Sequence, residues 1–190
     1  MNEQTNPANP LVLADVEHWR KWLDGNENSS DGVWLMLAKK GVTSPTSITY
    51  QSALEEALCS GWIDGQRRGL DERTFIQRFT PRRARSAWSQ RNVAIVERLA
   101  TEQRLRRRSV AEIDRAKADG RWHRAYPGQS SAKPPAALTA AFDAAPEARS
   151  AFSALSRAEQ YSVLHPLLTA PNDDALDKRI QRVIERLIER

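Results

Sequence analysis

Apolar residues follow two different spacings along this chain. Helical spacing after Asp15 and Thr49, whose side chains can cap a helix, predicts helices that start at these residues. A continuous apolar run over 33–38 predicts a buried strand. Strand-like segments over 62–68 and 74–79, joined by a short turn, predict an antiparallel hairpin.

The second half of the chain has helical spacing throughout. Apolar residues over 93–100 predict one helix, and the run from Ser109 to Glu112 has the form of a capping box that opens another. Residues 127–136 are rich in Pro, Gly and Ser and predict a linker. The last predicted helix, near 173–189, carries an apolar stripe formed by Ile180, Val183, Ile184 and Leu187.

These elements predict an α+β fold, in which a small antiparallel sheet packs with helices and a C-terminal helical subdomain follows. We expect a flexible tail over 1–12, an α+β domain over 13–126, the linker over 127–136 and a helical subdomain over 137–190.

Cysteine content and the distribution of apolar residues indicate the cellular compartment of the protein. The chain has 190 residues and one cysteine, Cys59, so it cannot form an intramolecular disulfide. Residues 1–10 are polar and show no signal-peptide pattern, and no apolar stretch reaches the roughly 20 residues that cross a bilayer. We therefore expect a cytoplasmic protein without membrane insertion.

The net charge of +5 is unevenly distributed. Residues 1–66 carry 4 basic and 9 acidic groups, whereas residues 67–108 carry 13 basic groups, all arginine, and 4 acidic groups. Arginine offers a planar donor fork that suits phosphate and carboxylate groups. The segment is therefore either an anion-binding surface or an ordinary solvated face. In the second case a GC-rich coding sequence has replaced lysine by arginine without functional meaning.

The stretch 78–89 is the strongest candidate for an anion site. Its arginines precede a predicted helix start, where free backbone amides and the helix dipole favour an anion. The competing interpretation is that its arginines pair with the acidic first segment while its tryptophan packs in the core. The candidate ligand-binding residues are Trp62, Asp64, Arg67, Arg78, Arg82, Arg83, Arg85 and Trp88.

Catalytic and metal-binding patterns are weak in this sequence. The three histidines are far apart, and there is no phosphate-binding Gly-Lys-Ser/Thr loop and no dinucleotide fingerprint. Cys59 lies near the end of a predicted amphipathic helix. Free cysteines are commonly buried, so we expect a buried structural thiol. Asp64 has no obvious second acid, base or metal partner. We therefore expect no metal and no cofactor.

Several runs carry a family resemblance. The runs Gly32–Leu35, Ala38–Gly41, Ala53–Gly69, Arg78–Asn92 and Ala116–Trp122 resemble those of bacterial YdeI/OmpD-associated proteins, and the similarity covers residues 13–190. The C-terminal part is similar to the bacteriocin-protection segment of that family. The N-terminal part is also similar to the YdhG-like α+β fold.

The resemblance implies a stress-protection protein, associated with resistance to bacteriocins or cationic antimicrobial peptides, and implies no reaction. We expect a non-enzymatic binding protein whose partner is an anionic small molecule or an acidic protein surface. One alternative is a nucleic-acid-binding protein using the same loop, which is disfavoured because no groove-reading motif is present. The other is an enzyme acting on a small acidic metabolite around Asp64. The oligomeric state is not predicted.

Overall fold

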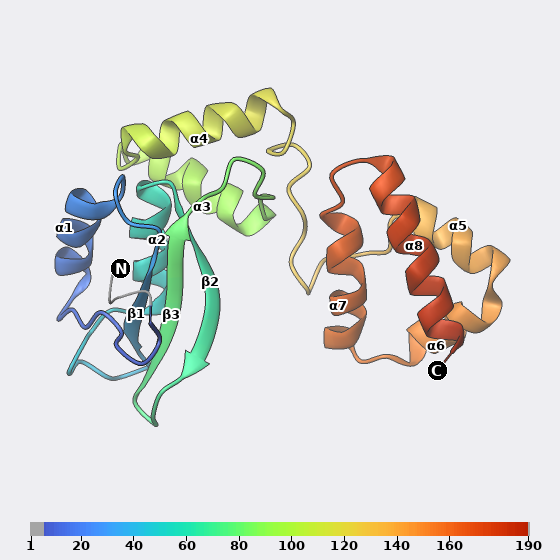
Figure 1. The fold of residues 1–190 in the computed structure, drawn as a ribbon, viewed down its shortest axis with the longest axis horizontal. Helices are drawn as coiled ribbons and strands as arrows, with labels where there is room; N and C mark the ends of the chain where they lie inside the picture. The colour runs from blue at the N-terminus through green and yellow to red at the C-terminus, as the bar shows by residue number, and fades with distance from the viewer. Residues whose placement is uncertain (1–5, 190) are drawn as a thin grey trace. The chain divides into compact units, whose positions relative to one another are not determined.

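A computed structural model describes residues 6–189. Within these residues the chain forms eight helices and one three-stranded antiparallel sheet (Figure 1). The elements, in chain order, are α1 (Val16–Asn26), β1 (Val33–Ala38), α2 (Tyr50–Cys59), β2 (Trp62–Gly69), β3 (Thr74–Pro81), α3 (Gln90–Thr101), α4 (Arg107–Ala118), α5 (Ala136–Ala144), α6 (Pro146–Ala154), α7 (Arg157–Leu168) and α8 (Asp173–Ile188). The predicted α+β class with a helical C-terminal region is confirmed.

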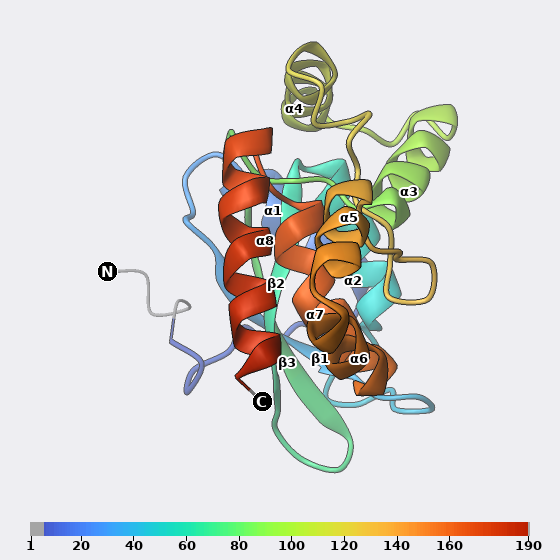
Figure 2. The ribbon, with the colours of Figure 1, turned by 90° about the vertical axis from the view of Figure 1, so that its right-hand side faces the viewer.

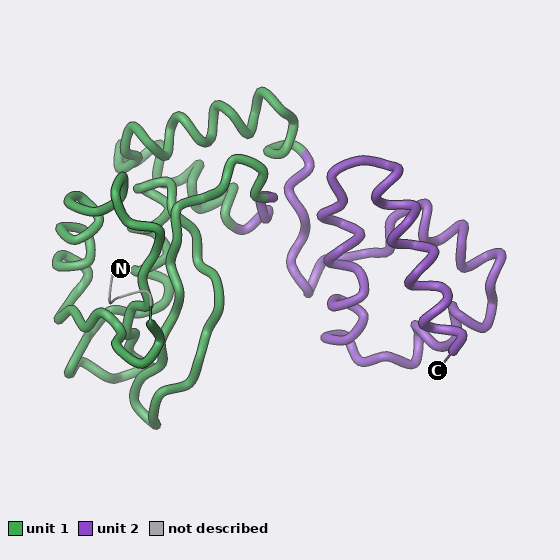
Figure 3. The backbone as a smooth tube through the Cα atoms, viewed as in Figure 1, with its two compact units in different colours: residues 1–86, 92–123 green, residues 87–91, 124–190 purple. Residues whose placement is uncertain are grey.

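The chain divides into two compact units (Figure 3). The N-terminal unit consists of residues 1–86 and 92–123, and the C-terminal unit consists of residues 87–91 and 124–190. Residues 127–135, which lie in the predicted linker, form no helix or strand.

In the N-terminal unit β3 is the central strand, between β1 and β2. The three strands begin at the predicted residues, and β2 and β3 continue past the predicted ends. Helices α1 and α2 pack on one face of the sheet, as predicted. The buried cluster there contains Trp19, Leu23, Val33, Leu35, Leu37, Ile48, Ala53, Ala57, Trp62, Phe75 and Phe79.

Local sequence signals account for the starts of α1 and α2. The Asp15 carboxylate accepts a hydrogen bond from the backbone N–H of His18, at 3.0 Å. Thr49 and Ser52 form a reciprocal capping box at the start of α2. Both predicted caps are therefore confirmed.

The capping box predicted at Ser109 is wrong. Helix α4 begins at Arg107, and its N-cap residue, Arg106, makes no side-chain cap bond. The Ser109 hydroxyl instead donates to the carbonyl of Leu58, at 2.7 Å, and the Glu112 carboxylate binds arginines. Tertiary partners satisfy these polar groups, so the local pattern does not mark the start of the helix.

The C-terminal unit is a bundle of α5, α6, α7 and α8, and Figure 2 shows α8 beside α7. The apolar stripe of α8 packs as predicted: Ile180, Val183 and Leu187 are buried, and Ile184 is partly buried against the same cluster. The other buried members are Leu138, Phe142, Ala148, Phe152, Val163, Leu164 and Leu167. None of the helices within residues 6–189 is long and apolar enough to cross a membrane.

Candidate functional site

The structure separates the eight residues that the sequence grouped into one anion site. Trp62 is fully buried in the core of the N-terminal unit. Its ring nitrogen donates to the Glu27 carbonyl, at 3.2 Å, and its ring meets Trp22 edge-on. Trp62 therefore packs the core and does not form an exposed wall for a ligand.

Asp64 lies on the helix-facing side of β2, opposite Phe79 of β3. Its carboxylate accepts a hydrogen bond from the Tyr50 hydroxyl of α2, at 2.7 Å. Among residues 6–189, no group of three or more His, Cys, Asp or Glu side chains could hold a metal ion. The hydrogen bond ties β2 to α2 and gives Asp64 a structural role.

A β-bulge separates Asp64 from the arginines that follow it in β2. The register shifts between Asp64 and Arg67, and the buried Gln77 side chain donates to the Gly65 carbonyl there, at 2.7 Å. Beyond the bulge the Arg67 guanidinium lies 3.9 Å from the centre of the Phe75 ring. The Arg68 guanidinium lies 5.0 Å from the centre of the Trp34 ring. Both cations thus cover aromatic side chains.

The arginines of β2 are far from the loop that follows β3. Arg68 pairs with Ile76, whereas Trp62 pairs with Pro81 at the other end of the hairpin. Five residues of extended chain span about 16 Å at about 3.3 Å per residue. Arg67 and Arg68 therefore do not share a small ligand with the loop after Pro81. Arg78 lies between these ends, opposite Trp34 of β1.

Arg82 holds the loop after β3 in place. It is 7% exposed, and its backbone N–H donates to the Gly61 carbonyl, at 3.1 Å. Its guanidinium lies 3.5 Å from the Ser86 carbonyl, which also accepts from the Arg121 guanidinium at 3.0 Å. The backbone N–H of Arg83 donates to the Ser86 hydroxyl, at 3.2 Å, and closes the turn.

Arg83 and Arg85 are the exposed arginines of this loop. Within the described part of the chain neither side chain has a hydrogen bond, an ion pair or a ring contact. Trp88, by contrast, is buried and belongs to the C-terminal unit, where its carbonyl accepts from the backbone N–H of Tyr126. We define Arg83 and Arg85, presented by the turn from Arg82 to Ser86, as the arginine loop.

The later arginines of the basic segment do pair with the acidic first segment. Glu56 of α2 is 2% exposed and accepts from Arg20 at 2.9 Å and from Arg104 at 2.5 Å. Arg106 pairs with Asp24 at 2.7 Å. Arg104 and Arg106 lie outside the 78–89 stretch, so these pairs explain part of the charge of the basic segment and leave the interpretation of that stretch open.

Burial raises the pKa of the Glu56 carboxyl, but the hydrogen bonds from Arg20 and Arg104 outweigh it. The pKa of Glu56 therefore lies below its ordinary value of 4.5, and the group is charged at neutral pH. Burial and the negative charge of Glu56 raise the pKa of the nearby Cys59 thiol to about 11. Cys59 is thus a buried, protonated thiol, as its sequence position predicts.

Sequence reasoning did not identify a polar cavity in the C-terminal unit, lined by Gln129, Ala132, Arg157, Gln160, Tyr161 and Leu164. The four lining residues from α7 recur at helical spacing, which is the only signal of the cavity in the sequence. That signal is weak, because the exposed face of an ordinary surface helix also mixes polar and apolar residues.

Two family models match separate parts of the chain, one in the N-terminal part and one at the C-terminus. Residues 11–112, more than half of the chain, match the family model described as Domain of unknown function (DUF8412), and the chain belongs to this family. Residues 131–190 match the model described as Bacteriocin-protection, YdeI or OmpD-Associated, which confirms the resemblance for the C-terminal region. The YdhG-like similarity stays a prediction. No curated protein matches the chain, and no solved structure does.

Proposed function

We propose that this protein is a non-enzymatic binding protein of the YdeI/OmpD-associated type, and that its arginine loop binds an anionic partner. One observation carries the proposal. Arg83 and Arg85 are exposed and have no carboxylate partner among residues 6–189, whereas Arg104 of the same basic segment is neutralised by Glu56. The loop therefore presents two positive charges that no carboxylate among residues 6–189 neutralises.

The backbone of the loop supports this role. The turn from Arg83 to Ser86 is closed in both directions, because Ser86 also donates its backbone N–H to the Arg83 carbonyl at 2.9 Å. A loop that is already ordered loses less entropy when a partner binds. Hydrogen bonds from guanidinium to phosphate or carboxylate are strong, so phosphorylated small molecules and acidic protein surfaces are the partners we propose.

The C-terminal match supports a proposal for the physiological role. The description of the C-terminal match names bacteriocin protection, and we propose the same role for this chain, as resistance to bacteriocins or cationic antimicrobial peptides under stress. We place its action in the cytoplasm, because a single buried cysteine is typical of proteins in a reducing compartment.

The test is the Arg83→Ala/Arg85→Ala double variant, with inorganic pyrophosphate and citrate as probes in isothermal titration calorimetry. We expect at least about tenfold weaker binding, since each charge-assisted hydrogen bond contributes roughly 1.5–3 kcal/mol. The melting temperature should change by less than about 2 °C, because both side chains are exposed. The Arg182→Ala/Arg186→Ala variant, which removes two exposed arginines of α8, is the matched control.

Two outcomes would contradict the proposal. One is unchanged affinity in the double variant. The other is tight binding of a single-stranded oligonucleotide with a steep salt dependence, which would favour the nucleic-acid alternative. The Arg82→Ala variant should instead lower the melting temperature, because Arg82 is buried and holds the turn.

A further inference from the structure

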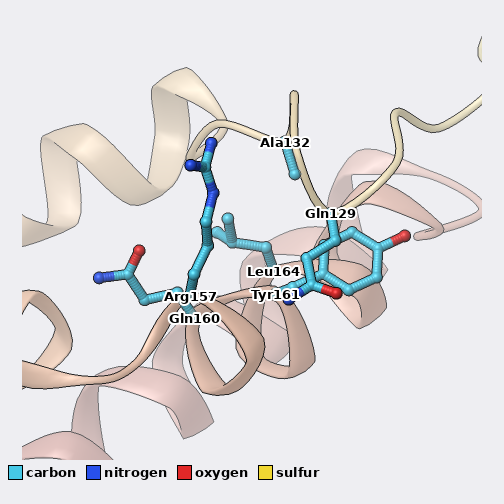
Figure 4. Close-up of a pocket in the computed structure, with 6 residues that line it drawn as sticks. All are labelled: Gln129, Ala132, Arg157, Gln160, Tyr161 and Leu164. Carbon is cyan, nitrogen blue, oxygen red and sulfur yellow. The ribbon is translucent and has the colours of Figure 1, made fainter.

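A cavity of about 280 Å³ lies between the 127–135 segment and α7 in the C-terminal unit (Figure 4). Arg157, Gln160, Tyr161 and Leu164 line it from one face of α7, and Gln129 and Ala132 line it from the segment. Figure 4 shows the Arg157 side chain reaching from the helix toward the segment that carries Ala132. All six residues belong to one unit, so the cavity is a feature of that unit alone.

Two hydrogen bonds hold the 127–135 segment against α7. The Arg157 guanidinium donates through Nη2 to the Ser130 carbonyl, at 2.6 Å, and the Tyr161 hydroxyl donates to the Pro127 carbonyl, at 3.2 Å. Both anchors are long side chains, whereas Ala132, a segment residue that lines the cavity, is small. The anchors therefore fix the segment at a distance from α7 and leave the cavity open.

The walls of the cavity differ in chemistry. Most of the accessible lining is polar, and Leu164, which is 3% exposed, and the Tyr161 ring belong to its smaller apolar part, which we call the apolar floor. Arg157 alone among the six carries a charge, and in residues 6–189 its Nε and Nη1 atoms have no hydrogen-bond partner. The Gln160 amide is engaged elsewhere, because it donates to the carbonyls of Phe152 and Leu155.

The charge of Arg157 is not cancelled by its own helix. Glu159 is the acidic residue in the first turn of α7, and its carboxylate accepts from the backbone N–H of Ser156 at the N-cap, at 2.9 Å. Arg157 is the first residue of α7, where the helix dipole is positive and adds to the attraction for an anion. One fixed cation beside an apolar floor matches a ligand with one negative charge and a short apolar tail.

We propose that this cavity binds a small monocarboxylate with an apolar or aromatic tail. The carboxylate would take the Nε and Nη1 donors of Arg157, and the tail would lie over Leu164 and the Tyr161 ring. The volume equals that of about nine waters at about 30 Å³ each, which suits a ligand the size of phenylacetate. The cavity is made of residues of the C-terminal unit, whereas the arginine loop belongs to the N-terminal unit. The ligand of the cavity differs from the anion proposed for the arginine loop because it has an apolar tail.

The experiment is titration of the full chain with phenylacetate, acetate and inorganic phosphate, followed by ¹⁵N-resolved NMR and calorimetry. We expect phenylacetate to bind at least about tenfold more tightly than acetate, because the tail loses its contact with water on the apolar floor. Phosphate should bind more weakly than phenylacetate for the same reason. Equal affinity for phosphate and phenylacetate, or no binding of phenylacetate, would overturn the proposal.

Two variants locate the ligand. Arg157→Gln should weaken phenylacetate binding at least about tenfold, whereas Arg182→Gln, an exposed arginine of α8, should leave it unchanged. Because Arg157 also anchors Ser130, Ala132→Phe provides a second test that keeps the guanidinium and fills the cavity. Loss of binding in both Arg157→Gln and Ala132→Phe supports the proposal. Binding retained in either variant refutes it, and the Arg83→Ala/Arg85→Ala variant should bind phenylacetate normally.

Discussion

Both units of this protein have a buried apolar cluster, but they differ in where their charged groups lie. In the N-terminal unit, carboxylates are buried among arginines: Glu56 is 2% exposed and Glu112 is 5% exposed. In the C-terminal unit, the helices meet through an apolar cluster, and the ion pairs between Arg149 and Asp143 and between Lys178 and Asp174 lie on the surface. Charge is therefore structural in one unit and peripheral in the other.

This difference matters because the two kinds of contact respond to different conditions. Burying an ionised carboxylate costs free energy unless it is paired, and protonation removes the pairing, so the contribution of such a pair depends on pH. Apolar burial contributes at all pH values, and exposed ion pairs contribute little. The N-terminal unit should therefore be the acid-sensitive part of the molecule.

The largest expected effect is on the apolar cluster. Ile180→Asp places a carboxylate on the buried face of α8, where Ile180 is 6% exposed. Loss of burial costs about 1.5–3 kcal/mol before the penalty for the charge is counted, so the C-terminal helices should unfold. Hydrogen exchange of residues 136–188 measures this. Gln181→Asp, on the exposed face of the same helix, is the control, and equal protection in the two variants would contradict the packing.

A smaller effect is expected from Glu56→Gln in the N-terminal unit. Removing one member of a buried ion pair costs about 3–5 kcal/mol, but here Arg20 and Arg104 remain partly exposed, so we expect about 2 kcal/mol at pH 7. Urea unfolding measures this free energy. Glu97→Gln, an exposed carboxylate of α3, should change it little.

The pH dependence of the same variant sharpens this prediction. The folded pKa of Glu56 is below 4.5, so the unfolded chain binds the proton more tightly. Its contribution is fully present above pH 4.5 and is lost as the pH falls through the folded pKa. The stability difference between the wild-type protein and Glu56→Gln should therefore shrink below pH 4.5, and a difference that stayed constant would count against the ionised pair.

The smallest effect is expected at the surface of the C-terminal unit. Arg149→Ala removes the ion pair with Asp143, whose side chain is 66% exposed. Exposed pairs contribute about 0.2–1 kcal/mol at most, so the melting temperature should fall by less than about 2 °C. Differential scanning calorimetry at low and high salt tests this. A loss comparable to that in Glu56→Gln would remove the contrast between the units.

The candidate site shows where sequence reasoning reached its limit. The excess of arginine over 67–108 was visible in the sequence, but the sequence alone did not separate its members. Arg104 pairs with Glu56, 48 positions earlier in the chain, whereas Arg83 and Arg85 stay exposed. Trp62 and Trp88 looked like walls of a ligand site, and both are buried.

The sequence by itself determined the local elements. Strands β1, β2 and β3, the caps of α1 and α2, and the apolar stripe of α8 follow from spacing and capping chemistry, which act between residues close in the chain. Only the tertiary structure decided which charges are neutralised, where α4 begins, and that α7 and the 127–135 segment line a cavity. The reason is that an ion pair, a buried hydroxyl or a cavity depends on groups distant in sequence, and no local pattern records which of them meet.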